Sequence, residues 1–327
     1  MNRHTVFVFA PSASMAVMPA DMRSLGIARL GTLGFDVVIG DHVDCTRFHT
    51  AGTVQERLAD FRTALACEDV DLVMAAFGGY NSNQLLQGLE FQEIELSGKR
   101  FIGFSDVVAM LLPISQRSQA MAFHGPSFSV FCDPGISEYT VDGFVRTLRG
   151  EVVSYSSSSV IADDKWWLKN GYGPREWVQF DGWKVYREGE ARGKILGGNL
   201  ETLCSLAGTP FVPSFRDRIL FIEDATGTRP GAFHRDLTHL LHMGVIDDIV
   251  GLAIGAPPRG SALAEPGCLD YILADVVGSA TDMPVLYDVN CSHVDPMMTI
   301  PLEREAILRA CRDPAIEVNV DLPSECI

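Results

Sequence analysis

A serine at position 105 stands where an apolar run gives way to a helical pattern. Residues 99–102 have the composition of a short strand, Gly103 follows them, and the residues after Ser105 have the spacing of a helix. A sharp turn between a strand and a helix holds a serine hydroxyl out over a sheet edge, where it can attack a carbonyl carbon. The G-x-S-x-G pattern has a second glycine where this chain has Val107, so a serine that only caps the helix is the alternative.

A nucleophilic serine needs a base and a carboxylate that orients the base. Glu223 directly follows the apolar run 220–222, and His293 comes shortly after the apolar run 286–289. Both lie at the ends of predicted strands, where α/β folds place functional groups. The order Ser105, Glu223, His293 therefore predicts an acyl-transfer site in which the imidazole moves the proton and the carboxylate fixes its tautomer. In the alternative, Glu223 caps the next segment and His293 lies in an ordinary turn.

The negative tetrahedral intermediate of acyl transfer also needs hydrogen-bond donors. One candidate is the backbone N–H of Asp106, directly after the serine, and the other is the N–H of Gly79 in the Gly78-Gly79 turn. Glycine at such a turn lets the backbone approach a substrate closely. Loss of one oxyanion donor typically lowers the rate about 100- to 1000-fold.

The N-terminal part of the chain alternates strand-like and helix-like segments. The predicted strands are residues 5–10, 36–40, 72–77, 101–104 and 120–124, and the predicted helices are residues 20–33, 54–66, 82–89 and 107–116. This alternation predicts a parallel sheet covered on both faces, with ligands bound at the carboxyl ends of its strands. Residues 1–150 are therefore assigned to one α/β domain that carries the serine.

A second α/β pattern begins at residue 193. The predicted strands are residues 194–197, 218–222, 249–254 and 285–289, and the predicted helices are residues 199–207, 232–243 and 269–277, before a β-like tail. Residues 193–327 are assigned to a smaller C-terminal domain that carries Glu223 and His293. The length of the chain also favours two domains.

The connection between these domains, residues 151–192, holds a run of serines and all 4 tryptophans of the chain. The tryptophans are Trp166, Trp167, Trp177 and Trp183. Indoles are costly to leave in water. The segment is therefore either an ordered linker that packs its own indoles or a lid that covers a ligand.

Composition excludes several classes of partner and site. The net charge of -16 argues against nucleic acid and against anionic membranes, and no apolar stretch approaches the roughly 20 residues of a membrane span. Residues 1–11 are typical of a first strand rather than a signal peptide. The 8 cysteines form no C-x-x-C pair, and His234, His239 and His242 have no thiol or carboxylate at matching spacing, so neither a disulfide framework nor a metal site is predicted.

Several motifs in a fixed order resemble those of the LD-carboxypeptidase family of serine peptidases. They are residues 78–86, 102–106, 124–126, 196–203, 220–224 and 293–301. The resemblance covers nearly the whole chain. It implies a flavodoxin-like N-terminal domain with the nucleophile on an elbow, a smaller C-terminal α/β domain, and an active site at their junction. It also implies a Ser-His-Glu triad, which falls on Ser105, His293 and Glu223.

The resemblance further implies a cytoplasmic homodimer that needs no metal or other cofactor. Within the family, LD-carboxypeptidases cut murein tetrapeptides between an L-residue and a terminal D-residue. The branch of the microcin immunity protein MccF cuts the amide that joins a C-terminal aspartate to an adenylate-like group. Residues 81–83, the tryptophan-rich connection and residues 197–200 look more like the MccF branch, which predicts a small peptide or an aminoacyl-nucleotide as the substrate.

On this interpretation, five residues are candidate substrate contacts. They are Asn83 and Asn199 as polar contacts, and Trp166, Trp167 and Trp183 as indoles that could stack on a purine. The chain departs from the family where Cys291-Ser292 replaces a more usual glycine before His293, and where residues 225–228 lack the charged residue that the family resemblance leads us to expect soon after Glu223. Arg229 is a candidate substitute there. A two-domain protein that binds a small ligand without chemistry is the non-enzymatic alternative.

Overall fold

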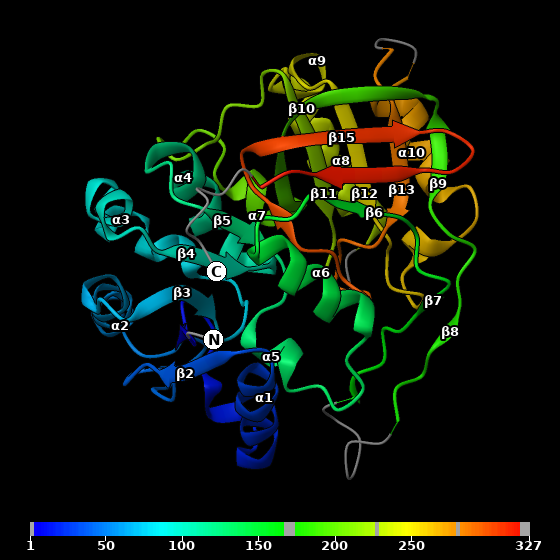
Figure 1. Ribbon diagram of the computed structural model, residues 1–327. Helices are drawn as coiled ribbons and strands as arrows, with labels where there is room; N and C mark the ends of the chain where they lie inside the picture. The colour runs from blue at the N-terminus through cyan, green and yellow to red at the C-terminus, as the bar shows by residue number, and fades with distance from the viewer. Residues whose placement is uncertain (1–2, 167–173, 226–228, 279–281, 321–327) are drawn as a thin grey trace. The chain divides into compact units, whose positions relative to one another are not determined.

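The computed structural model describes residues 3–166, 174–225, 229–278 and 282–320 (Figure 1). These residues form two compact units. The first holds the described residues up to Ile136, with Trp166 and Pro174, and the second holds Ser137–Lys165 and the described residues from Arg175 onward.

The first unit is built on a parallel sheet. Its strands are β1 (His4–Phe9), β2 (Phe35–Ile39), β3 (Val70–Ala75), β4 (Arg100–Gly103) and β5 (Ala122–His124). They lie in the order β2-β1-β3-β4-β5, and every neighbouring pair is parallel. This is the flavodoxin-like order, in which ligands bind outside the carboxyl ends of the strands near the point where the strand order reverses. The predicted N-terminal fold is confirmed.

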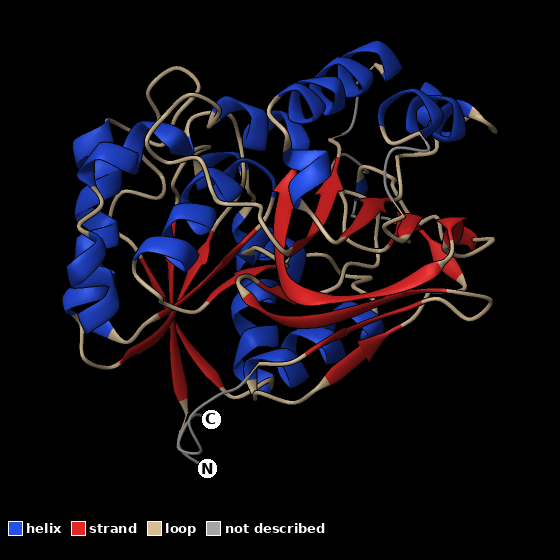
Figure 2. Cartoon of the chain, turned by 90° about the horizontal axis from the view of Figure 1, so that it is seen from above, coloured by secondary structure: helices blue, strands red, loops and turns tan. Residues whose placement is uncertain are grey.

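Helices cover both faces of this sheet (Figures 1 and 2). They are α1 (Ala20–Thr32) and α5 (Phe128–Phe131), which pack together, and α2 (Val54–Ala66), α3 (Phe91–Ser97) and α4 (Val108–Arg117), which form the other group. Short 3-10 turns are η1 (Met15–Val17), η2 (Ser82–Gly88) and η3 (Ser105–Val107). The predicted helix over 82–89 is thus a 3-10 segment, and α3 and α5 lie where no helix was predicted.

The second unit contains a mixed sheet. Its strands, in spatial order, are β6 (Val153–Tyr155), β16 (Ala315–Val318), β15 (Arg304–Ala310), β10 (Gly189–Asn199), β11 (Arg218–Glu223), β12 (Gly251–Gly255), β13 (Val285–Val289) and β9 (Lys184–Arg187). The run β10 to β13 is parallel and the remaining pairs are antiparallel. Strands β11, β12 and β13 are buried almost throughout, as a sheet covered on both faces requires.

Helices of the second unit connect and cover these strands. They are α6 (Glu138–Leu148), α7 (Leu200–Ser205), α8 (Pro230–His242), α9 (Val245–Asp248) and α10 (Cys268–Val276), with the short elements η5 (Ala262–Ala264) and β14 (Ile300–Pro301). Helix α8 contacts α7, α9 and α10. Strands β10, β11 and β12 therefore alternate with helices as predicted.

The segment around residue 150 belongs to the second unit. Strand β6 pairs with β16, and the buried hydroxyl of Tyr155 lies 3.0 Å from Thr147 Oγ1 and donates to the carbonyl of Thr299 at 3.1 Å. These contacts join α6 and β6 to the rest of the second unit. The second unit thus begins at Ser137, before residue 150.

The tryptophan-rich connection is ordered where the structure describes it. Strand β7 (Val160–Ile161) pairs with β8 (Val178–Gln179) as an antiparallel hairpin. The side-chain oxygen of Asn290 accepts hydrogen bonds from the backbone N–H of Ser158 at 3.0 Å and from the indole of Trp183 at 2.8 Å. The serine run and Trp183 are thereby tied to the end of β13.

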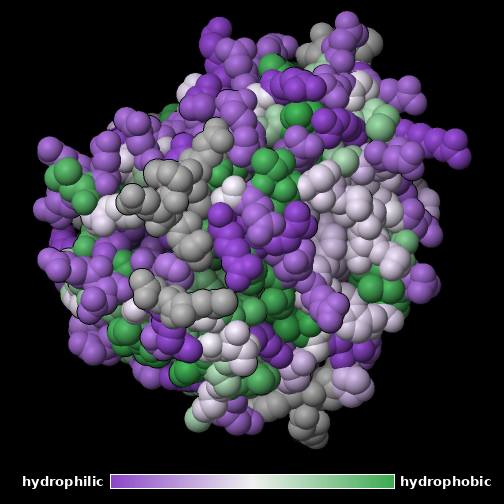
Figure 3. Space-filling view, in the orientation of Figure 1, coloured by the Kyte–Doolittle hydropathy of each residue, from purple (hydrophilic) through white to green (hydrophobic). Residues whose placement is uncertain are grey.

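Hydrophilic side chains cover much of the face shown in Figure 3, in keeping with a net charge of -16. Within the described ranges, no helix is both long enough and apolar enough to span a bilayer.

Candidate active site

Ser105 occupies a strained turn between β4 and α4. Its φ of 62° lies in the left-handed region, which residues with a side chain rarely adopt. The preceding Phe104 is extended, and its carbonyl accepts a hydrogen bond from the N–H of Val107 at 3.3 Å as the helical turn begins. Such a conformation persists only where the surrounding structure enforces it. The predicted strand-to-helix elbow is present in the first unit.

The close packing in the elbow falls on Gly103, the first glycine of the G-x-S-x-G pattern, whereas Val107 occupies the position of the second glycine. A Cβ atom at Gly103 would lie 2.9 Å from Val107 Cγ1 and 3.0 Å from the Cβ of Ala75 on β3. Both distances are shorter than ordinary carbon contacts, so only glycine fits there. Val107 therefore fills the space beneath the turn that a bulkier residue at 103 would take.

The Gly78-Gly79 turn passes directly beside the serine. A Cβ atom at Gly78 would lie 3.0 Å from Ser105 Oγ and 3.6 Å from the backbone nitrogen of Asp106. Gly79 has a φ of 148°, and a Cβ atom there would overlap the hydroxyl of Ser12. The Gly78 backbone and the backbone nitrogen of Asp106 thus lie close to the Ser105 side chain.

Two buried side chains that sequence reasoning did not single out hold this turn. Ser12 Oγ accepts hydrogen bonds from the N–H groups of Tyr80 at 3.0 Å and Asn81 at 2.9 Å. Arg57 Nη1 donates to the carbonyls of Pro11 at 2.8 Å and Asn81 at 3.2 Å. Ser12 follows a predicted strand, and this position could have identified it as a residue near the site. Arg57 lies within a predicted helix, where an arginine side chain is normally expected on the surface.

Asp106 braces the same turn from the other side. Its carboxylate accepts from the backbone N–H of Ser82 at 2.9 Å, and its carbonyl accepts from the hydroxyl of Ser82 at 2.6 Å. Asn83, the next residue, is exposed on η2. The motif 78–86 therefore acts first as a support for the turn beside Ser105.

In the second unit, His293 and Glu223 form a close pair. His293 Nδ1 lies 2.6 Å from Glu223 Oε2, the length of a charge-assisted hydrogen bond. Glu223 ends β11 and is 0% exposed, whereas the His293 side chain is 19% exposed. The other carboxylate oxygen, Oε1, is buried and has no hydrogen-bond partner in the part of the chain that the structure describes.

The surroundings of His293 favour its protonated form. Burial, the largest single effect, lowers the pKa of the imidazole, but the charge of Glu223, its hydrogen bond and the charges of Asp224 and Asp295 together outweigh it. The net result is a pKa above the ordinary value for histidine. These carboxylates stabilise the imidazolium that forms when a base accepts a proton.

The residues before His293 fix its loop. Ser292 Oγ donates to the carbonyl of Ala256 at 2.6 Å and accepts from the N–H of Val294 at 3.1 Å. A Cβ atom at Gly255 would lie 2.8 Å from the Cβ of Ser292 and 2.9 Å from that of Glu223. Ser292 and Gly255 therefore let the loop pack against the end of β11.

The thiol of Cys291 is wholly buried, and burial raises its pKa, so it remains neutral. The Cys-Ser pair that replaces the usual glycine thus provides packing and a hydrogen-bonded turn rather than a reactive group.

The predicted substrate contacts have distinct surroundings. Asn199 ends β10 beside Glu223 in register, and its side-chain oxygen caps α7 by accepting from the N–H and hydroxyl of Thr202 at 3.0 and 2.9 Å. Trp183 is buried against Asn290, as described above. Trp166 is buried within the first unit, and Trp167 lies outside the described residues.

The two units together hold the groups that acyl transfer requires. The first presents a serine on an elbow beside backbone donors, and the second presents an imidazole oriented by a buried carboxylate. Comparison with known domains supports this chemistry. The N-terminal domain of the LD-carboxypeptidase family matches residues 6–125, and its C-terminal domain matches residues 192–308.

Related proteins and structures agree with these domain matches. A putative carboxypeptidase of Treponema pallidum (strain Nichols) is 32% identical over 91% of this chain and 87% of the relative. The microcin C7 self-immunity protein MccF of Escherichia coli is 28% identical over 91% of this chain and 88% of its own. A crystal structure of an MccF-like protein from Bacillus anthracis str. Ames superposes with a TM-score of 0.90 at 28% identity, covering 98% of each chain.

MccF in complex with aspartyl sulfamoyl adenosine superposes with a TM-score of 0.89 at 27% identity, covering 98% of this chain and 96% of that one. The domain matches and these likenesses extend over both units. The chain thus belongs to the LD-carboxypeptidase family and is a serine peptidase-type hydrolase.

Proposed function

We propose that Ser105, His293 and Glu223 act as a catalytic triad, with Ser105 and His293 coming within hydrogen-bond reach during turnover. The observation that carries this proposal is the left-handed conformation of Ser105 beside the Gly78 backbone and the Asp106 nitrogen. A side chain is held in such a conformation where it has a task that the ordinary conformation cannot serve.

In the proposed reaction, His293 Nε2 accepts the proton of Ser105 as the serine oxygen bonds to the substrate carbonyl carbon. The carbonyl electron pair moves to oxygen, and the N–H groups of Gly79 and Asp106 donate to that oxyanion. The C–N bond then breaks as the imidazolium protonates the leaving nitrogen. Water, deprotonated by His293, releases the acyl group and restores the serine.

The proposed substrate is an aminoacyl-nucleotide or a peptide-adenylate of the microcin type. MccF, a relative along nearly the whole chain, has been solved with aspartyl sulfamoyl adenosine and with glutamyl sulfamoyl guanosine. Its active-site mutant carries substitutions at a serine, an asparagine and a lysine. We assign Ser105 and Asn199 to the first two roles. No lysine lies in residues 224–229, and Arg229 is the candidate cation there.

A murein peptide is the second candidate substrate. A probable murein peptide carboxypeptidase of Bacillus subtilis (strain 168) is 28% identical over 95% of this chain. Residues 225–228 lack the charged residue that the family resemblance leads us to expect soon after Glu223, which leaves the choice between the two substrates open. A murein tetrapeptide is therefore tested beside the nucleotide substrate.

A paired assay tests the function. The protein is incubated with a peptidyl or aspartyl adenylate analogue that has a cleavable amide, and separately with a murein tetrapeptide, and the products are weighed by mass spectrometry. We expect release of the amino acid from the nucleotide. Release of terminal D-alanine alone would assign the murein activity instead. A fluorophosphonate probe should label Ser105 in either case, and the Ser105→Ala variant is the matched control.

The family resemblance also leads us to propose that the protein is a cytoplasmic homodimer that acts on small molecules rather than on nucleic acid or membranes. Sedimentation velocity tests the dimer, and fractionation of the source cells tests the location.

A further inference from the structure

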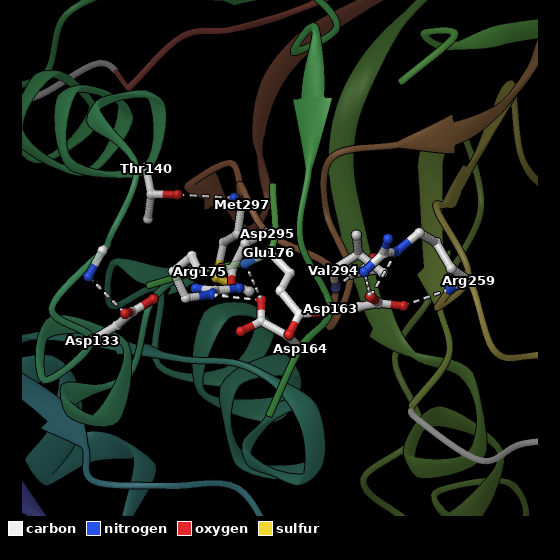
Figure 4. Close-up of polar contacts among 12 residues, drawn as sticks. Asp133, Thr140, Asp163, Asp164, Arg175, Glu176, Arg259, Val294, Asp295 and Met297 are labelled. Atoms are coloured by element: carbon white, nitrogen blue, oxygen red, sulfur yellow. Dashed lines mark hydrogen bonds and ion pairs between the residues drawn. The ribbon is translucent and has the colours of Figure 1, made fainter. Parts of the chain in front are cut away.

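We propose that Arg175 is a positioning residue for the catalytic base, because it ties the tryptophan-rich connection to the loop that carries His293. This inference rests on the proposed function. Arg175 Nη2 lies 2.8 Å from Asp295 Oδ2, and its Nε donates to Asp164 Oδ1 at 3.0 Å. Figure 4 shows the guanidinium of Arg175 between these two carboxylates. The side chains of Arg175 and Asp164 are 2% and 5% exposed, whereas that of Asp295 is 29% exposed.

One further contact joins the same two segments, and a second ties the connection to the loop after β12. Ala162 and Asp295 form a bridge in which each backbone N–H donates to the other residue's carbonyl at 2.9 Å. Asp163 accepts from the backbone N–H of Arg259 at 2.7 Å and from its guanidinium at 2.6 and 2.8 Å, as Figure 4 shows. The backbone after His293 is therefore held by a segment more than a hundred residues earlier in the chain.

The chemistry of this bridge requires arginine. A planar guanidinium can bond two carboxylates at fixed angles, whereas a lysine ammonium offers one point charge. The Arg175 guanidinium also lies 5.2 Å from the ring centroid of Trp177. Because Asp164 is buried, loss of the arginine removes a positive charge from a place where uncompensated carboxylate charge is costly, and it also removes the 2.8 Å contact to Asp295. The Asp295 segment should then move.

Two effects connect the bridge to His293, which lies two residues before Asp295. The first is geometric, since a base displaced by about 1 Å loses on the order of 100-fold in rate. The second is electrostatic, since Asp295 is one of three carboxylates, with Glu223 and Asp224, that raise the pKa of His293 against the effect of burial. The positive charge of Arg175 offsets that of Asp295.

The test separates geometry from charge with three variants. Arg175→Met removes both the positive charge and the planar guanidinium. We therefore expect kcat to fall roughly 10- to 100-fold with little change in KM, and the pKa of His293 to rise. Arg175→Lys keeps the charge without the planar fork, so kcat should fall while the pKa stays near that of the unmodified protein. Asp295→Asn removes the carboxylate charge, so the His293 pKa should fall. The pKa is read by NMR titration of the protein with labelled histidines.

Arg309→Gln is the matched control. Arg309 also bridges two carboxylates, Glu190 at 3.1 Å and Glu317 at 3.4 Å, and Glu190 lies at the opposite end of β10 from Asn199. It should leave kcat and the His293 titration unchanged.

Unchanged kcat in both Arg175 variants, or the same titration of His293 in Arg175→Met, Asp295→Asn and the control, would overturn the inference. If Arg175→Met does not fold, Arg175→Lys and Asp295→Asn decide the question. Failure of the proposed function has a different signature, because the unmodified protein would then neither hydrolyse a substrate nor react with fluorophosphonate. The NMR titration measures the bridge in that case too.

Discussion

The Nδ1 atom of His293 lies 2.6 Å from Oε2 of Glu223, a carboxylate that water does not reach. Glu223 is the last residue of β11, so the sheet itself fixes its position. The pair commits Nδ1 to the carboxylate and leaves Nε2 as the ring nitrogen for proton transfer. The strand thus determines both the orientation and the tautomer of the base.

Replacement of Glu223 by glutamine should shift the pH profile. Burial lowers the pKa of His293, but the neighbouring carboxylates together raise it above the ordinary value, with Glu223 contributing most through its charge and hydrogen bond. Only neutral imidazole can accept the serine proton, so kcat/KM falls as the pH is lowered through that pKa. In Glu223→Gln the fall should begin at lower pH, and kcat should drop on the order of 10⁴-fold. An unchanged acidic limb would contradict the assignment.

Substitution of Ser105 should separate turnover from stability. Ser105→Ala should retain ligand binding and lose kcat by roughly 10⁴- to 10⁶-fold. Ser105→Gly should lose turnover equally. Its free energy of unfolding, measured by denaturant titration, should exceed that of Ser105→Ala by about 1 kcal/mol, because glycine tolerates a φ of 62°. Equal stability of the two variants would mean that the left-handed turn carries no strain.

Gly78→Ala should damage catalysis directly. The added methyl group would lie 2.9 Å from the Cβ of Ser105 and 3.0 Å from its hydroxyl, so the serine or the turn must move. We expect kcat to fall about 100-fold or more, as for loss of an oxyanion donor. Gly31→Ala is the control, since its methyl group has only the end of Arg3 nearby, at 3.8 Å. Full activity in Gly78→Ala would refute the placement of the turn.

Ser12→Ala should weaken the support of the same turn. The variant leaves the N–H groups of Tyr80 and Asn81 without their shared acceptor, which should lower the free energy of unfolding by about 1–3 kcal/mol and reduce kcat more than it raises KM. Ser24, an exposed serine on α1 that bonds only to the carbonyl of Ala20 in the described contacts, provides the control variant Ser24→Ala. Comparable losses in both variants would argue against a special role for Ser12.

The sequence predicted best those elements whose ends are marked by local residues. Helix α2 begins and ends where predicted, because Thr53 and Glu56 form a capping box at its start. Strand β13 also has its predicted bounds, since its apolar run is bounded by a proline and by polar residues. Ser105, Glu223 and His293 were identified because each follows a strand, and their joint action stays a prediction.

Long-range partners explain what the sequence could not predict. Helix α3 buries only Ile94, so its sequence has little helical periodicity. Arg57 and Arg175 look like surface charges along the chain, yet each is buried by contacts with distant segments, and Asp295 lies 120 residues from Arg175. The same holds for α6, because its Thr147 contacts Tyr155 on β6 and Thr299, which lies 152 residues further along the chain.

The hydrogen bond from the Trp183 indole to Asn290 provides an optical reporter beside the base. Indole emission responds to the polarity and hydrogen bonding of its ring nitrogen, and Asn290 lies three residues before His293. A protein that keeps Trp183 as its single tryptophan would therefore signal rearrangement of this loop by a change in emission wavelength. Ligand addition and active-site substitution could then be followed in real time without a chromogenic substrate.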